Sequence, residues 1–301
     1  MRAEPCFFAF YPEACYCAPT CMNREGIEIG SADGGASVPR VAASSYLNTA
    51  PLVWSFIKGA RRQEVRLLTD TAPARCSDML ARGEVEAALV PVIEYQRVPE
   101  IAIVPDVCVG SRRRVRSVLL VTSGRELKEI RRVSLSVESR TSVALVQIIF
   151  REFLGVEPVW RTSAPDLQAM LARSDAALMI GDPAMTFSRE GLRVYDLASL
   201  WREYTGLGFV FAMWMARADA LASVRGVNFA AARDEGLEQV EEIARAYEME
   251  LGLPRSELRE YLLENISFEL DEEMREGLDL FYNLAHKHGL IPVLRPLQFM
   301  V

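Results

Sequence analysis

The sequence predicts an α/β protein with two lobes and a binding cleft between them. Candidate strands and helices alternate twice along the chain, first over residues 40–122 and again over residues 132–215. Such alternation indicates parallel sheets covered by helices on both faces. Two apolar strands, residues 117–123 and 209–215, are expected to cross between the units. Because ligands of open α/β sheets bind beyond the carboxyl ends of the strands, we expect a cleft at this junction.

Short apolar runs between turn-forming residues mark the strands of the first unit. Pro51 fits the first turn of a helix that runs to residue 56, and Gly83 is a natural end for a helix over residues 74–82. The strands around these helices are expected at residues 40–43, 65–68, 87–90, 101–104 and 115–122.

The second unit repeats this alternation and is followed by a helical tail. Its strands are expected at residues 132–137, 159–161, 176–180, 192–195 and 209–215, and its helices at 141–154, 166–172 and 198–203. The tail has amphipathic stretches at residues 228–251, 255–263 and 272–288, which we expect to pack back onto the first unit. The predicted lobes are therefore residues 38–122 plus 211–301 (lobe one) and 123–210 (lobe two).

The first 37 residues differ from the rest of the chain. Residues 1–37 show no periodic pattern and contain a Gly-rich run, so we expect a disordered extension or a start codon assigned too far upstream. The apolar run at residues 7–10 is too short for a signal peptide, which favours a cytoplasmic protein. Cysteines crowd this region, but they lack the spacing of a zinc site and have no histidine nearby.

Composition narrows the classes of partner. The net charge of −7 over 301 residues, with no dominant basic stretch, argues against nucleic acid. No apolar run reaches the roughly 20 residues of a membrane-spanning helix, so no membrane partner is expected. No cofactor or metal motif is recognisable, and both histidines, His286 and His288, lie outside every motif. A small-molecule ligand remains as the expected partner, and the oligomeric state stays open.

A polar segment directly before an apolar run predicts the start of a buried helix. It consists of Ser139, Arg140, Thr141 and Ser142. Unpaired backbone N–H groups and the positive end of the helix dipole make such a start suitable for a carboxylate. Arg140 adds a guanidinium that can hold a carboxylate through two hydrogen bonds. The segment is therefore either a small-anion pocket or an ordinary, well-capped helix.

Further small polar residues follow predicted strands and are expected to face the same cleft. They are Ser45, Asn48, Thr49, Ser117 and Asp182. Asp182 either lines the cleft or belongs to a plain Gly-Asp-Pro turn. Farther along the chain, Thr205 and Gly206 either contact a ligand carboxylate or simply end a helix. The convergence of several clusters favours the anion pocket.

Motifs from both units identify a resemblance to a known family. They are Asn48-Thr49-x-Pro51, the stretch from Leu80 to Tyr95, Val115-x-Ser117-Val118, Ser139-Arg140-Thr141-Ser142, Ile180-Gly181-Asp182-Pro183, and Trp201-x3-Thr205-Gly206-x2-Phe209. In this order they resemble the chorismate dehydratases, the first enzymes of the futalosine route to menaquinone. The resemblance covers residues 38–217 and continues more loosely beyond. It implies a type II periplasmic-binding-protein fold.

The resemblance also implies a reaction. Chorismate would lose its ring hydroxyl and a neighbouring ring proton, giving 3-[(1-carboxyvinyl)oxy]benzoate, which makes the protein a carbon–oxygen lyase. Catalytic roles would fall to Asn48 and Ser117, as hydrogen-bonding partners of the substrate, with no metal or other cofactor. Two alternatives remain: a solute-binding protein for a small carboxylate, and the sister activity that makes dihydroxynaphthoate. The sister branch typically carries a Ser-Pro-Cys-Pro-Asn-Asp-like opening, and residues 44–49 depart from it.

Overall fold

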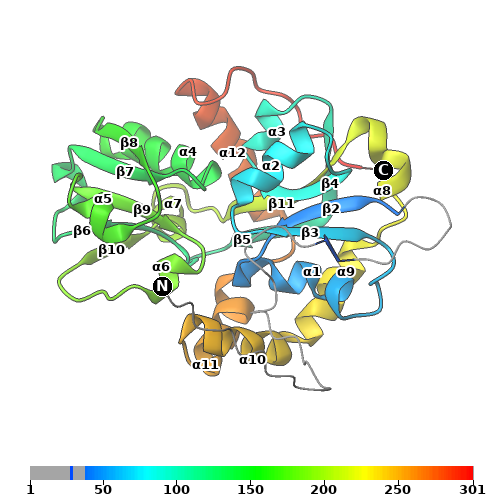
Figure 1. Ribbon diagram of the computed structural model, residues 1–301. Coiled ribbons are helices and arrows are strands. Elements are labelled where there is room, and N and C mark those ends of the chain that lie inside the picture. Colours follow the sequence, from blue (N-terminus) through cyan, green and yellow to red (C-terminus); the bar gives the residue numbers. More distant parts are fainter. Residues whose placement is uncertain (1–27, 30–37, 301) are drawn as a thin grey trace, which may run out of the picture.

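The computed structural model describes residues 28–29 and 38–300, which form two lobes, each built on its own sheet (Figure 1). In spatial order, the six-stranded sheet of the first lobe is β1 (Glu28–Ile29), β3 (Arg66–Asp70), β2 (Arg40–Ser44), β4 (Ala87–Pro91), β11 (Phe209–Arg217) and β5 (Ile101–Ser111). The five-stranded sheet of the second lobe is β10 (Arg193–Asp196), β6 (Val118–Thr122), β9 (Ala176–Ile180), β7 (Arg132–Ser136) and β8 (Val159–Ser163). The predicted two-lobed α/β fold is confirmed.

Helices cover both sheets at close to the predicted positions. In the first half of the chain they are α1 (Ala50–Ile57), α2 (Pro73–Ala81), α3 (Glu94–Arg97) and α4 (Thr141–Ile148), which continues as a π-helix over Ile149–Leu154. In the second half they are α5 (Leu167–Leu171), α6 (Pro183–Thr186), α7 (Leu197–Thr205), α8 (Leu221–Val224), α9 (Phe229–Glu238), α10 (Val240–Leu251), α11 (Arg255–Glu260) and α12 (Glu272–Lys287). None of the described helices is both long and apolar enough to span a bilayer.

The helical tail packs on the first lobe, as predicted, through α9 against α1 and α12 against β11. The tail helix expected over residues 228–251 is broken at Gln239 into α9 and α10. Close approach between α9 and α1 depends on Gly236, where an added Cβ would lie 1.9 Å from the Pro51 carbonyl oxygen. The tail is therefore part of the first lobe's core.

The prediction that both sheets are parallel is wrong. The sheets are mixed, since β11 runs antiparallel to both β4 and β5, whereas β2 is parallel to β3 and β4. This follows from the chain path: the chain leaves the first lobe after β5 and returns along β11, so the two strands run in opposite directions. An apolar strand sequence does not encode that direction.

The strands expected to cross between the lobes do not cross. β6 lies wholly in the five-stranded sheet and β11 wholly in the six-stranded sheet, so residues 118–122 pair in the second lobe and residues 209–210 in the first. The crossings are the short segments 112–117 and 206–208. The predicted extension, residues 1–37, lies outside the described residues except for β1, which pairs antiparallel with β3.

Candidate functional site

A cavity lies where the two lobes meet. Its empty volume is about 590 Å³, which includes open solvent at its mouth. The first lobe contributes residues that follow β2, and the second lobe contributes the loop before α4 and the end of β9. The wall is formed by Ser44, Tyr46, Asn48, Thr49, Pro73, Leu89, Pro91, Val109, Val115, Val118, Glu138, Ser139, Arg140, Thr141, Ser142, Ile180, Gly181, Phe211 and Ala212.

Asn48 and Thr49 enter the wall from a 3-10 turn, Leu47–Thr49, that joins β2 to α1. The Thr49 hydroxyl donates to the carbonyl oxygens of Ser44 and Tyr46, at 2.5 and 2.8 Å, so it shapes the turn. The Asn48 side-chain oxygen is buried and has no hydrogen-bond partner among the described residues. Ser45 does not line the cavity, since its backbone pairs with Asp70 and Tyr247 behind the wall.

Ser117 lies in the crossing segment between two wall residues, Val115 and Val118, but is fully buried and does not itself line the cavity. Its Oγ accepts a 2.7 Å hydrogen bond from the hydroxyl of Tyr261. Tyr261 begins the π-helical segment Tyr261–Asn265, far away in the sequence. The predicted catalytic pair therefore occupies one region, with Asn48 in the wall and Ser117 just behind it.

All of the predicted helix-start residues, Ser139, Arg140, Thr141 and Ser142, line the cavity, and α4 begins at Thr141. The side chain of its N-cap residue, Arg140, makes no capping hydrogen bond. The Thr141 hydroxyl instead accepts a 3.3 Å bond from the Ile93 backbone N–H of the first lobe. The first-turn N–H groups of α4 lack partners within the helix, so they favour an anion at the wall.

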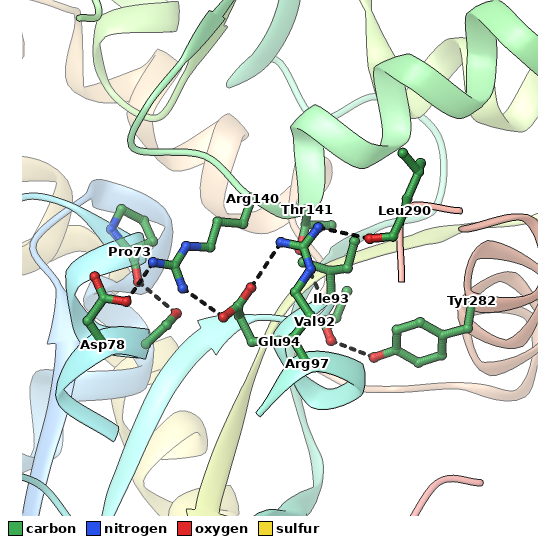
Figure 2. A network of polar contacts seen from close by, with 11 residues as sticks. Pro73, Asp78, Val92, Ile93, Glu94, Arg97, Arg140, Thr141, Tyr282 and Leu290 are labelled. Carbon is green, nitrogen blue, oxygen red and sulfur yellow. Dashed lines mark hydrogen bonds and ion pairs between the residues drawn. The ribbon is translucent and has the colours of Figure 1, made fainter. Parts of the chain in front are cut away.

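The Arg140 guanidinium joins the lobes rather than facing a ligand (Figure 2). It donates to Glu94 of α3 at 2.7 Å and to Asp78 of α2 at 2.6 Å. Arg97 also contacts Glu94, whose side chain is 4% exposed. Because two carboxylates already occupy the guanidinium, the predicted pairing of Arg140 with a substrate carboxylate is not what this geometry supports. Its charge holds α2 and α3 against the start of α4.

Asp182 is a second link between the lobes. Both carboxylate oxygens accept from the Leu47 backbone N–H, at 3.0 and 3.2 Å. Next to it, Gly181 has a φ of +65°, and the Tyr46 ring lies where a Cβ would stand, 2.6 Å from its nearest atom. The Tyr46 hydroxyl also donates to Glu138 at 3.0 Å. Asp182 thus anchors the Asn48 turn from behind and does not line the cavity itself.

Burial raises the pKa of Asp182 to about 7, although the Leu47 N–H partly opposes the shift. The unfolded chain releases this proton near the ordinary value of 3.8, so the folded state binds the extra proton between pH 4 and 7. Stability from this group should therefore fall as pH rises through that window. We expect Asp182→Asn, which does not titrate, to lose this part of the pH dependence in denaturant melts at pH 5 and pH 8. The exposed change Asp279→Asn should keep the parent's dependence; an unchanged slope in Asp182→Asn would contradict the assignment.

Thr205 and Gly206 do not line the cavity. The Thr205 hydroxyl donates to the Trp201 carbonyl at 2.7 Å and accepts from the Leu207 N–H at 3.1 Å. Gly206 ends α7 with a φ of +76°. Of the two interpretations, the structure supports the helix end.

Sequence reasoning missed Tyr46, Glu138, Phe211 and Tyr261, which surround the site. Tyr46 stands between Ser45 and Asn48, which the sequence predicts to face the cleft, whereas nothing near Tyr261 in the sequence marks it. Within residues 28–29 and 38–300, no cluster of three or more His, Cys, Asp or Glu side chains is arranged to hold a metal ion. His288 contacts Glu152 at 2.8 Å and is not part of the cavity wall.

The two lobes and the cavity between them define a periplasmic-binding-protein-like fold. Protein AF1704 from Archaeoglobus fulgidus is similar, with a TM-score of 0.69 and 20% identity over 84% of this chain and 98% of its own. So is the aliphatic sulphonate binding protein SsuA of Escherichia coli, with a TM-score of 0.57 and 16% identity over 87% and 93%. At these identities the likeness concerns the fold alone.

The chain belongs to the menaquinone biosynthesis family, whose model matches residues 39–287. A relative, the chorismate dehydratase of Thermus thermophilus, is 34% identical over 257 residues, which are 78% of this chain and 91% of that protein. The family resemblance deduced from the sequence motifs is confirmed.

Proposed function

We propose that this protein is a chorismate dehydratase of the futalosine route, a lyase that converts chorismate into 3-[(1-carboxyvinyl)oxy]benzoate and water. The observation that carries the proposal is the cavity wall, where Asn48 and the start of α4 stand together in a chain 34% identical to a chorismate dehydratase. The elimination breaks one C–O and one C–H bond and makes the ring aromatic. Aromatisation supplies much of the driving force, so orientation and charge placement suffice.

Different parts of the cavity wall suit different parts of chorismate and of the reaction. Leu89, Val109 and Phe211 give it an apolar face for the ring. The N–H groups at the start of α4, with Ser139 and Ser142 beside them, suit a carboxylate. Asn48 supplies hydrogen bonds where charge develops. We assign proton removal to a carboxylate of the substrate itself, because the wall holds no histidine and its Glu138 is bound by Tyr46.

The test is incubation of the purified protein with chorismate in the presence of a metal chelator, followed by mass spectrometry. The proposal expects loss of one water and a product with the spectrum of an enolpyruvyl benzoate. Unchanged chorismate would contradict it.

A solute-binding protein for a small carboxylate is the second candidate, favoured by the similarity to the sulphonate-binding protein. It would bind chorismate or another carboxylate tightly without converting it. Equilibrium binding measured beside the turnover assay separates the two functions. The sister dihydroxynaphthoate activity would instead leave chorismate intact and convert a later intermediate.

A further inference from the structure

We infer that Tyr261 is a positioning residue that fixes the Ser117 hydroxyl directly behind the part of the cavity wall that holds Asn48. The inference rests on the proposed function and adds a residue that no sequence motif indicates. Tyr261 comes from the helical tail, whereas Ser117 lies in the crossing segment and Asn48 in the turn after β2. The Tyr261 phenol therefore connects the helical tail to the crossing segment behind the cavity wall.

The geometry places the Tyr261 hydroxyl directly against Ser117. Both residues are fully buried, and the phenol donates to Ser117 Oγ at 2.7 Å. Among the described residues, the Ser117 hydroxyl donates to the Val115 carbonyl at 3.5 Å, which is long for an O–H···O bond. Ser117 thus receives a strong hydrogen bond, while its own proton has only a weak partner among the described residues.

The Tyr261 phenol can donate this bond only if it is protonated. Burial raises the pKa of Tyr261 well above its ordinary value of 10, although hydrogen bonds with Ser117 and Asn48 partly oppose the shift. The phenol therefore keeps its proton at neutral pH and has one hydrogen to donate. That hydrogen goes to Ser117.

Asn48 contributes separately, from the cavity wall. Its amide oxygen is buried and has no hydrogen-bond partner among the described residues, so it can act as an acceptor. The two side chains therefore differ in what they offer: Ser117 keeps a proton to donate, and Asn48 keeps an oxygen to accept.

This difference matches what elimination requires. The departing hydroxyl gains negative charge and is stabilised by a donor, and a fixed donor needs no reorganisation during the reaction. Loss of the phenol would free the Ser117 hydroxyl to turn, so the transition state would suffer more than substrate binding. Tyr261 would act through Ser117 without touching the substrate.

The test is Tyr261→Phe, which keeps the ring and removes the hydroxyl. We expect kcat for chorismate to fall about 10- to 100-fold, with KM changed by less than about threefold. The matched control is Tyr282→Phe, since Tyr282 is also buried and donates a 2.6 Å bond, but to the Val92 carbonyl. The control should lose a similar hydrogen bond and keep its turnover.

Combination with Ser117→Ala distinguishes positioning from a general loss of structure. If Tyr261 acts through Ser117, adding Tyr261→Phe to Ser117→Ala should lower kcat little further, because the two residues act as a unit. A merely structural role would multiply the two losses, and that result would overturn the inference. So would full turnover in Tyr261→Phe. If the parent protein forms no product at all, the proposed function fails, and the inference fails with it. Full turnover in both the parent and Tyr261→Phe is a different result, which overturns the inference alone.

Discussion

Replacing Asn48 with alanine is expected to lower kcat for chorismate by about 10²- to 10³-fold, the usual loss when one preorganised hydrogen-bonding group is removed. Asn48 lines the cavity, and its unpartnered amide oxygen is available to the substrate. Binding energy comes mainly from the apolar wall and the α4 start, which the substitution leaves in place. KM and the equilibrium affinity should therefore change by less than about fivefold. Steady-state kinetics with product quantification, alongside equilibrium binding, measures both.

Ser117→Ala should behave in the same direction, with turnover lost before binding. The control is Asn283→Ala, which removes an exposed asparagine whose amide donates to its own helix at the Asp279 carbonyl. It should match the parent protein in every parameter. If Asn48→Ala and Ser117→Ala both keep full turnover, the assignment of catalytic roles to these two residues is wrong, even if the protein converts chorismate.

Structural features that depend on residues close together in the chain can be predicted from the sequence. Pro51 and Gly83 mark a helix start and a helix end close to where α1 begins and α2 stops. The polar cluster at residues 139–142 does line the cavity, because a helix start after a strand must face the edge of the sheet. The strand-end pattern predicts that Asn48 faces the cleft, but its catalytic role comes from the family resemblance, since a single asparagine in a turn carries no local signal of chemistry.

Features that depend on distant residues were not predictable. The Arg140 guanidinium is bound by Asp78 and Glu94, which stand 62 and 46 positions earlier, and no periodicity indicates such pairing. Tyr261 reaches Ser117 across 144 positions. β6 was assigned to the wrong lobe for a related reason, because an apolar strand is suited to either sheet. The local sequence pattern predicts each helix or strand, whereas the residues that it contacts depend on the tertiary fold.

Replacing Arg140 with methionine is expected to destabilise the protein by about 3 kcal/mol, the scale of removing one partner from a buried ion pair. Glu94 is almost fully buried and, among the ion pairs of the described residues, would keep the 3.3 Å contact with Arg97, while Asp78 is half exposed and can be solvated. Methionine fills much of the same volume, so packing loss is small. Denaturant unfolding at pH 7 measures the change. Because Arg140 also joins the lobes, the affinity for chorismate should fall along with stability.

The buried charge of Glu94 provides the decisive comparison. If the loss in Arg140→Met comes from a buried carboxylate that has lost its 2.7 Å partner, adding Glu94→Gln should restore part of the stability, since a neutral amide costs less to bury. Arg82→Met is the matched control, because Arg82 makes a 2.7 Å pair with Glu84 on an exposed surface. That pair should contribute less than about 1 kcal/mol. Equal stability of Arg140→Met and Arg82→Met, with no recovery from Glu94→Gln, would mean that the ion pairs of Arg140 do not hold the lobes together.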